Sequence, residues 1–235
     1  MVTIQNLHKK FAKNIVLSGI DLNIDSGGIF AVLGPNGSGK TTLIKAILGM
    51  VIPNKGDISV LGENIKQSSN YRNSIDYLPQ IANFPSNLKV KELIKMIKDL
   101  RDRPSDDQRL IELFNLTPFL DKKLGTLSGG TKQKVNLVLT FMFDSPLIIL
   151  DEPTTGLDPI SLIRLKALIN EEKSRGKTIL ITSHIMSFVE EVSDEIVFLL
   201  EGKIYFKGSI DELKKNTGQP DFEHAIASIL TIDNA

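Results

Sequence analysis

The sequence predicts an α/β fold in which a mixed or parallel core sheet carries an antiparallel β subdomain at the N-terminus and an inserted α-helical subdomain. Three features of the 235 residues indicate it: period-two alternation near the start, short apolar runs bounded by turn residues, and a helical stretch between those runs. We expect a single domain over residues 1–235. Its helical subdomain should lie at about 83–145 and a C-terminal helical tail at about 209–235.

The composition excludes several classes of protein. Lys+Arg and Asp+Glu balance at 28 each, whereas a protein that mainly binds nucleic acid carries a basic excess. The chain has no cysteine, which rules out a disulfide framework, a thiolate metal site and a thiol nucleophile. The N-terminus lacks a secretory apolar core, and no apolar run approaches the roughly 18 residues that span a bilayer. We therefore expect a cytoplasmic protein whose membrane role, if any, comes through a partner.

The first eighty residues read as strands around one helix. The segments "VTIQNL" and "IDLNI" alternate with period two and predict half-buried antiparallel strands. The run "GGIFAVLG" predicts a buried strand, and "TTLIKAILGM" has helical spacing with a glycine near its end. Two further short strands are predicted at "GDISVLG" and "SIDYLP".

The middle of the chain has helical periodicity. Val90, Leu93, Ile94 and Ile97 fall at i, i+3, i+4 and i+7, and the lysines between residues 89 and 98 predict a solvated face. The polar segment "RDRPSDDQ" reads as a connector before a second helix, "LIELFNL". Strands are then predicted at "PLIILDEP", "KTILITSH", "EIVFLLEG" and "KIYFKGS".

The tail should form a short helix, a Gly/Pro turn and a second helix. Phe222, Ile226, Ile229 and Leu230 make an apolar stripe on the second helix. Packing against the core is the simpler interpretation of this stripe, and a regulatory or partner-docking role is the alternative.

The loop "GPNGSGKTT" predicts a phosphate-binding site. Gly34 to Thr41 fits G-x-x-x-x-G-K-[ST] between a predicted strand and a predicted helix, the context that separates this motif from a chance match. Glycines let backbone N–H groups turn toward phosphate oxygens, Lys40 reaches the β- and γ-phosphates, and the Thr41 hydroxyl can ligate Mg²⁺. The predicted nucleotide-binding residues of this loop are Gly34, Pro35, Asn36, Gly37, Ser38, Gly39, Lys40, Thr41 and Thr42.

The strand "LIILDEP" provides an acidic pair. Asp151 stands at the predicted strand end, where its carboxylate can hold the magnesium shell. Glu152 beside it is placed to polarise an attacking water. Ordinary turn chemistry is the alternative for such a pair, and the phosphate loop upstream argues against it.

Six ordered motifs resemble those of ATP-binding-cassette (ABC) ATPases over nearly the whole chain. They are "GPNGSGKTT", "LPQ", "LSGGT", "LIILDEP", "GLDP" and "TSH", of which "LSGG" is the most specific. The resemblance implies the P-loop NTPase fold of this family and Mg²⁺-dependent ATP hydrolysis. It also implies that Gln80 contacts the magnesium ion and the attacking water, and that His184 hydrogen-bonds the γ-phosphate. These two residues and Glu152 form the predicted catalytic set, and Thr41, Gln80 and Asp151 form the predicted metal set.

Some of the implied roles have simpler alternatives. Asp158 would lie at a subunit contact, but it could equally be a helix N-cap. Phe11 would stack on adenine, but an aromatic near a strand end also suits the core. His184 could be a structural histidine, and Gln80 a turn residue. Thr131 occupies the place of the glutamine in the family's more frequent LSGGQ, and we expect this change to be tolerated.

The resemblance also implies partners. ATP would be sandwiched between the phosphate loop of one protomer and Ser128, Gly129 and Gly130 of another, in a head-to-tail homodimer on the inner face of the membrane. The segments "YLPQIANFPSNLKVKEL", "LSGGTKQKVNL" and "FDSPLIILDEPTTGLDP" most resemble the ATPase of the transporter that assists maturation of the copper centre of nitrous oxide reductase. That subgroup implies a multi-span permease and a periplasmic accessory protein.

Other functions remain as alternatives. They are the ATPase of a drug or lipid exporter, a soluble ABC ATPase acting on ribosomes or DNA, and a nucleotide-binding scaffold without turnover. Glu152 and His184 argue against the scaffold, and the balanced charge argues against nucleic acid. Copper itself should not bind this chain tightly, because it lacks cysteine and its histidines, His8, His184 and His224, are far apart in sequence.

Overall fold

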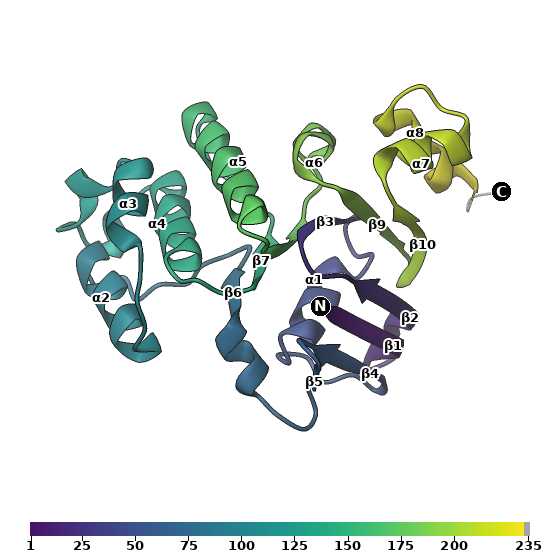
Figure 1. Cartoon of the computed structure of the whole chain (residues 1–235), viewed down its shortest axis with the longest axis horizontal. Coiled ribbons are helices and arrows are strands. Elements are labelled where there is room, and N and C mark those ends of the chain that lie inside the picture. The colour runs from purple at the N-terminus through teal and green to yellow at the C-terminus, as the bar shows by residue number, and fades with distance from the viewer. Residues whose placement is uncertain (233–235) are drawn as a thin grey trace.

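The computed structural model describes residues 1–232, and its centre is a six-stranded sheet (Figure 1). Its strands are β3 (Gly28–Leu33), β6 (Ile75–Leu78), β7 (Leu147–Asp151), β8 (Thr178–Thr182), β9 (Glu195–Leu200) and β10 (Lys203–Gly208). Their order is β10-β9-β3-β8-β7-β6, and only the β9–β10 pair is antiparallel. The predicted mixed, largely parallel core sheet is therefore confirmed.

A second, antiparallel sheet forms from the N-terminal part of the chain. Its strands are β1 (Val2–Phe11), β2 (Asn14–Ile24), β4 (Lys55–Val60) and β5 (Glu63–Asn64), in the order β2-β1-β4-β5. The first two are longer than the alternation predicted, because register shifts and the positive φ of Asn6 (46°) interrupt the pattern without ending the pairing. Phe11 consequently stands at the last residue of β1, beside the hairpin turn.

The core sheet separates two apolar clusters. Alternate residues of β3 contribute to each: Ala31 and Leu33 to one, Phe30 and Val32 to the other. Helix α1 (Lys40–Ile47) packs between the two sheets, because its Leu43 and Ile44 share a cluster with residues of both. Since both faces of β3 are covered, its residues form a continuous apolar run in the sequence.

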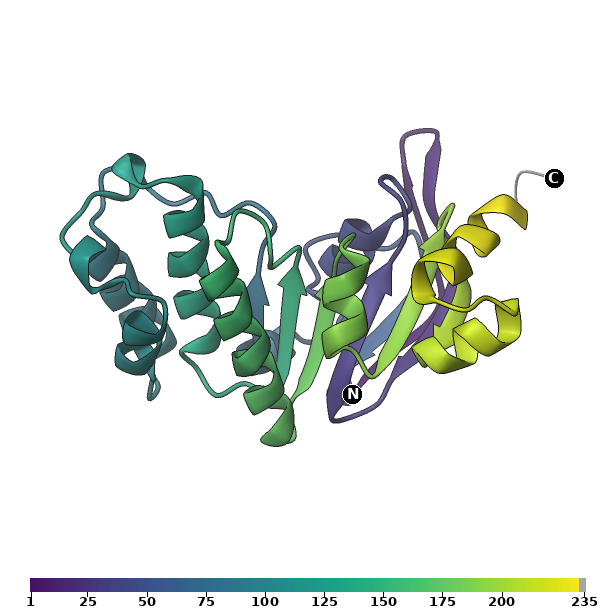
Figure 2. The same ribbon diagram turned by 90° about the horizontal axis from the view of Figure 1, so that it is seen from above.

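Three helices gather at one end of the molecule (Figures 1 and 2): α2 (Val90–Arg101), α3 (Asp107–Leu113) and α4 (Gly129–Phe141). In α2, Leu93 and Ile94 are buried while Lys91 and Lys95 are exposed, as the periodicity predicted. The second predicted helix is displaced: it begins at Asp107, inside the predicted connector, and ends before Asn115, whose φ is 52°. The left-handed Asn115 ends the helix, whereas Asp106 stands at the N-cap position without a side-chain capping bond.

Four more helices cover the sheet or extend the tail: α5 (Pro159–Ser174), α6 (Met186–Val192), α7 (Ile210–Thr217) and α8 (Phe222–Ile232). The sequence reasoning did not single out α5 and α6. Short 3-10 turns lie at Asn70–Ser74, Thr117–Phe119 and Leu124–Thr126. Within residues 1–232, we find no helix with the length and apolar character that crossing a membrane requires.

The predicted tail helices form, and the apolar stripe packs inward. Phe222 and Ile226 of α8 are buried, and Ile229 and Leu230 pack against the same core. This agrees with the packing interpretation of the stripe. The last three residues of the predicted tail lie outside the described residues.

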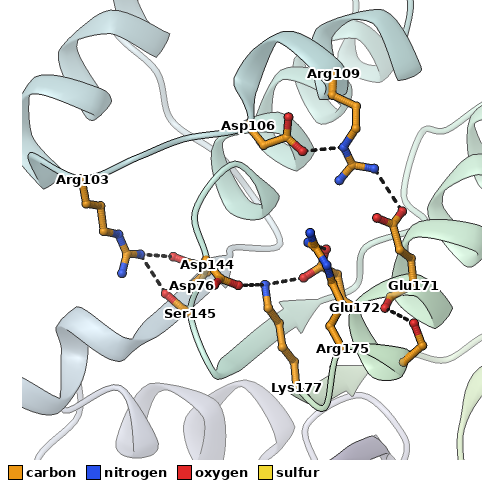
Figure 3. A network of polar contacts seen from close by, with 11 residues as sticks. Asp76, Arg103, Asp106, Arg109, Asp144, Ser145, Glu171, Glu172, Arg175 and Lys177 are labelled. Carbon is orange, nitrogen blue, oxygen red and sulfur yellow. Dashed lines mark hydrogen bonds and ion pairs between the residues drawn. The ribbon is translucent and has the colours of Figure 1, made fainter.

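A polar network near the amino ends of β6, β7 and β8 joins the helical end to the sheet (Figure 3). Arg103, just after α2, donates to Asp76 Oδ1 (3.2 Å) and to Ser145 Oγ (2.8 Å). Lys177 pairs with Glu172 and, at 2.9 Å, with Asp144. Asp76 is 1% exposed, and this burial raises its pKa to about 6 although Ser145 and the two arginines, Arg101 and Arg103, act in the opposite direction.

We expect Asp76 to give the stability of the protein a distinctive pH dependence. A carboxyl whose pKa rises on folding binds its proton more tightly in the folded state than in the unfolded state. Its contribution to the free energy of unfolding is therefore greatest below the unfolded pKa and is lost as pH rises through about 6. The free energy of unfolding of the wild type, minus that of Asp76→Asn, should fall by about 2–3 kcal/mol between about pH 4 and pH 7. Urea unfolding across this range measures the difference.

Asp144→Asn is the matched control from the same network. Lys177 holds the pKa of Asp144 below its usual value, so that carboxyl is already ionised across the range and its difference curve should be flat. Equal slopes for the two variants would contradict the role assigned to Asp76.

Candidate active site

The carboxyl ends of four strands place the predicted site residues at one edge of the core sheet. The phosphate loop follows β3, Gln80 follows β6, Asp151 ends β7, and His184 follows β8. Thr182 is in register with Val32 on one side and with Asp151 on the other. Open parallel sheets bind ligands at this edge because the loops that leave the strands there meet.

The phosphate loop depends on two glycines with left-handed backbone. At Gly34 (φ 148°) a Cβ atom would stand 2.0 Å from the Leu199 carbonyl oxygen. At Gly39 (φ 108°) it would stand 2.9 Å from the Val16 carbonyl oxygen, so both positions exclude a side chain.

Lys40, the first residue of α1, is 8% exposed and folds back over the phosphate loop. Its Nζ donates to the carbonyl oxygens of Gly34 (2.7 Å) and Pro35 (3.1 Å). The pKa of Lys40 is lowered by burial, and the charges of Glu152 and Asp151 offset only part of this effect. The ammonium therefore lies among oxygen atoms that an anion can displace.

The acidic pair is buried and rests on Thr182. Asp151 is 2% exposed; its Oδ1 accepts from the Thr182 hydroxyl, while its Oδ2 has no hydrogen-bond partner among the described residues. Glu152 has a left-handed backbone (φ 52°), and its N–H donates to the hydroxyl and to the carbonyl oxygen of Thr182, both at 3.1 Å. Strained non-glycine residues of this kind cluster at functional sites.

His184 and Glu152 are brought together. The Nδ1 atom of His184 lies 2.8 Å from Glu152 Oε2, and the side chain of His184 is 65% exposed. A histidine this exposed does not fill the core, and its predicted contact with a phosphate stays a prediction. Its second ring nitrogen makes no hydrogen bond to the residues that the structure describes.

Two cavities adjoin these residues. One, of about 350 Å³, is lined by Phe11, by Glu152 and by phosphate-loop residues that include Asn36, Gly37, Lys40 and Thr42. The other, of about 700 Å³, lies between the core and the helical end and includes Tyr77 and Asn136. Thr41, Gln80 and Asp151, the three predicted metal ligands, line both cavities.

The remaining predicted residues fall into two groups. Phe11 is 48% exposed, so it does not belong to the core. Ser128, Gly129 and Gly130 line neither cavity. Ser128 is exposed and caps α4 through a bond from the Thr131 N–H (3.3 Å), and the Thr131 hydroxyl lies 2.9 Å from that of Ser128.

Asp158 acts as the N-cap of α5, the simpler of its two predicted roles. It accepts from the Ser161 N–H at 2.9 Å and pairs with Lys134 of α4 at 2.6 Å. The bond from Lys134 is the main reason that the pKa of Asp158 lies far below its usual value.

Comparison with known proteins agrees with this geometry. The family described as "ABC transporter" matches residues 17–155, more than half of the chain. The chain belongs to the ABC transporter family. It is an ABC-type ATPase, and the ABC ATPase fold expected from the motifs is confirmed.

Several relatives resemble this ABC-type ATPase over most of its length. An uncharacterised ABC transporter ATP-binding protein, YhaQ of Bacillus subtilis, is 34% identical over 93% of this chain and 74% of its own. Nod factor export ATP-binding protein I of Rhizobium sp. is 33% identical over 88% and 70%. Lantibiotic transport ATP-binding protein SrtF of Streptococcus pyogenes is 34% identical over 90% and 92%.

Solved structures share the fold. An ATP-binding subunit of an ABC transporter superposes with a TM-score of 0.91 at 29% identity, covering 98% of this chain and 99% of its own. A dimeric ATP-binding cassette with ADP and Pi superposes with a TM-score of 0.80 at 23% identity, covering 89% and 98%. At that lower identity the second likeness concerns the fold alone.

Sequence reasoning missed Thr182, which contacts both members of the acidic pair. The signal was present, since this polar residue ends an apolar strand, two residues before His184. Tyr77 and Asn136 of the larger cavity were missed because no motif marks them.

We expect the Thr182 hydroxyl to stabilise the folded state. Thr182→Val keeps the shape of the side chain and removes the donor to Asp151 Oδ1, so that neither oxygen of this buried carboxylate accepts a hydrogen bond within residues 1–232. It should lower the free energy of unfolding by about 1–3 kcal/mol, as measured by urea denaturation without nucleotide.

Thr154→Val is the matched control. The Thr154 hydroxyl is buried and has no hydrogen-bond partner among the described residues, so its removal should leave stability unchanged or slightly raised. A loss for Thr154→Val as large as for Thr182→Val would contradict this assignment.

Proposed function

We propose that this ABC-type ATPase binds Mg²⁺-ATP in the cleft at the carboxyl edge of the core sheet and couples its hydrolysis to transport through a separate membrane permease. The observation that carries the proposal is the meeting of four groups there. They are the Lys40 loop, the Asp151 oxygen that has no partner within residues 1–232, the Glu152–His184 pair and Gln80.

The residues present fit a magnesium ion. Thr41, Gln80 and Asp151 would offer hydroxyl, amide and carboxylate oxygens, the hard ligands that Mg²⁺ prefers. The buried Oδ2 of Asp151 has no other partner among the described residues, which is costly for a carboxylate unless a cation satisfies it. When bound, the ion would neutralise charge on the phosphates.

The chain's own groups would perform the remaining tasks. Backbone N–H groups of the glycine loop and the Lys40 ammonium would hold the phosphates. Glu152 would accept a proton from the attacking water, with its carboxylate oriented by His184 Nδ1. The other ring nitrogen of His184 would donate to a phosphate oxygen.

We further propose a head-to-tail dimer. Ser128, Gly129 and Gly130 begin a helix of thirteen residues, but they line neither cavity that adjoins Lys40 in the same chain. A second protomer would bring its own Ser128 and the N–H groups of its α4 to the nucleotide, where the positive end of the helix dipole favours phosphate.

The names of the relatives bear on which transport system this subunit serves. Nod factor export and lantibiotic transport appear in the names of two relatives, which supports the proposal of an exporter with a multi-span permease. This subunit would then lie on the cytoplasmic face of the membrane. The resemblance to the nitrous oxide reductase maturation system, with its periplasmic accessory protein, stays a prediction without support from these relatives. Co-purification with a detergent-solubilised permease, as opposed to ribosomes, separates transport from the soluble alternative.

Lys40→Ala and Glu152→Gln should both abolish Mg²⁺-dependent ATPase activity, for different reasons. The first removes a charge contact to the phosphates and should weaken nucleotide binding. The second removes the proton acceptor, so ATP should still bind and hold a dimer that size-exclusion chromatography detects. Glu112→Gln, an exposed glutamate on α3, is the control and should remain active. A Glu152→Gln protein that stayed monomeric at saturating ATP, with and without its permease, would contradict the proposal.

A mixed dimer with Lys40→Ala in one protomer and Ser128→Arg in the other tests the sandwich. In the head-to-tail arrangement both lesions fall in one composite site and the second site is intact, so vanadate should trap one nucleotide per dimer. If Ser128 served its own chain, each site would carry one lesion and none would be trapped. The wild-type dimer, with two trapped nucleotides, is the reference for both outcomes.

A further inference from the structure

Lys9 and Phe11 lie two residues apart on β1, and their side chains meet. Alternate residues of a strand share one face of the sheet. The Lys9 ammonium stands over the Phe11 ring, 4.7 Å from its centroid, which is the geometry of a cation–π contact. The same ammonium donates to the Ile52 carbonyl oxygen at 2.8 Å, so two contacts hold it in place.

The Phe11 ring contacts both the cavity and the Lys9 ammonium. Phe11 lines the 350 Å³ cavity that also contains Lys40 and Thr41, whereas Lys9 does not line it. The ammonium therefore contacts the ring outside the lining of the cavity, and a residue that is 48% exposed leaves ring surface accessible to a ligand.

Hydrogen bonds hold the end of β1, which carries Lys9 and Phe11, against the segment that precedes β4. The Lys10 N–H donates to Asn54 Oδ1 at 2.8 Å, and the Asn54 N–H donates to the His8 carbonyl oxygen at 2.9 Å. Together with the bond from Lys9 to Ile52, these contacts fasten the end of β1 to the segment that precedes β4.

We propose that Lys9 is a positioning residue for the nucleotide base, acting through Phe11; the inference rests on the proposed ATP-binding function. The ammonium draws the π electrons of the ring toward its own side and fixes the ring plane. The cavity side then repels an electron-rich purine less strongly and is ordered before the base arrives. Lys9 thus contributes to recognition of the base and not of the phosphates.

Equilibrium binding of ATP and of inorganic triphosphate, which has no base, tests the inference. At about 0.15 M salt, Lys9→Met should raise the Kd for ATP, by at most roughly two- to fivefold, and leave the Kd for triphosphate unchanged. The full strength of an exposed cation–π contact is the upper limit, because the contact is also present in the free protein. Lys9→Arg keeps a cation over the ring and should retain wild-type affinity.

Lys10→Met is the matched control, because it removes the same charge from the next residue of the strand. The ring contact involves Lys9, so Lys10→Met should leave the Kd for ATP within the error of the wild type. Thermal unfolding verifies that each variant is folded, and Lys9→Gln replaces Lys9→Met if that variant is not.

A double-mutant comparison completes the test. Phe11→Ala alone should raise the Kd for ATP roughly tenfold or more, and adding Lys9→Met to it should change nothing further. Four results would overturn the inference while leaving ATP binding intact. Lys9→Met could have no effect on the Kd for ATP, or its effect could persist in the Phe11→Ala background. Its effect could also apply equally to triphosphate, or be reproduced by Lys10→Met. A wild-type protein that binds triphosphate but not ATP, or neither, would instead refute the proposed function, and the inference with it.

Discussion

Parallel pairing of β8 with β3 and β7 is the constraint on which the rest of this structure depends. It aligns Val32, Thr182 and Asp151 across three adjacent strands, so the segments that leave these strands begin side by side. Parallel strands of this kind need apolar cover on both faces, and the two clusters above and below the sheet provide it. The phosphate loop, the acidic pair and His184 are neighbours because of that register.

Charged groups are paired differently at the amino ends and at the carboxyl ends of the core strands. Near the amino ends, carboxylates face arginines and Lys177 in a dense network that joins the helical end to the sheet. At the carboxyl ends, and within the described residues 1–232, Asp151 keeps one buried oxygen without a partner and Lys40 donates only to backbone carbonyls of its own loop. An arrangement that leaves polar groups of opposite charge incompletely paired in a cleft is suited to a ligand that carries both signs, such as a nucleotide with its cation.

The start of α4 is tied to the segment that follows the acidic pair. Gln133 donates to the Pro153 carbonyl oxygen at 3.0 Å, and Lys134 pairs with Asp158 at 2.6 Å. A Cβ atom on Gly130 would stand 2.5 Å from the Gly156 carbonyl oxygen, so these two backbones are in close contact. In the proposed head-to-tail dimer, these contacts would connect the residues that serve one nucleotide with Glu152, which serves the other.

The sequence by itself determined the kind of fold and predicted a set of nucleotide-binding residues, because both depend on local patterns. Glycine spacing around Lys40, the apolar run before Asp151 and the helical period of α2 are properties of short segments. The tertiary structure decided the rest. The support of Asp151 and Glu152 by Thr182, the raised pKa of Asp76 and the placement of Lys9 behind Phe11 each join residues through packing that no local pattern encodes. The full length of β1 was likewise set by strand pairing, which can override a short stretch of periodicity.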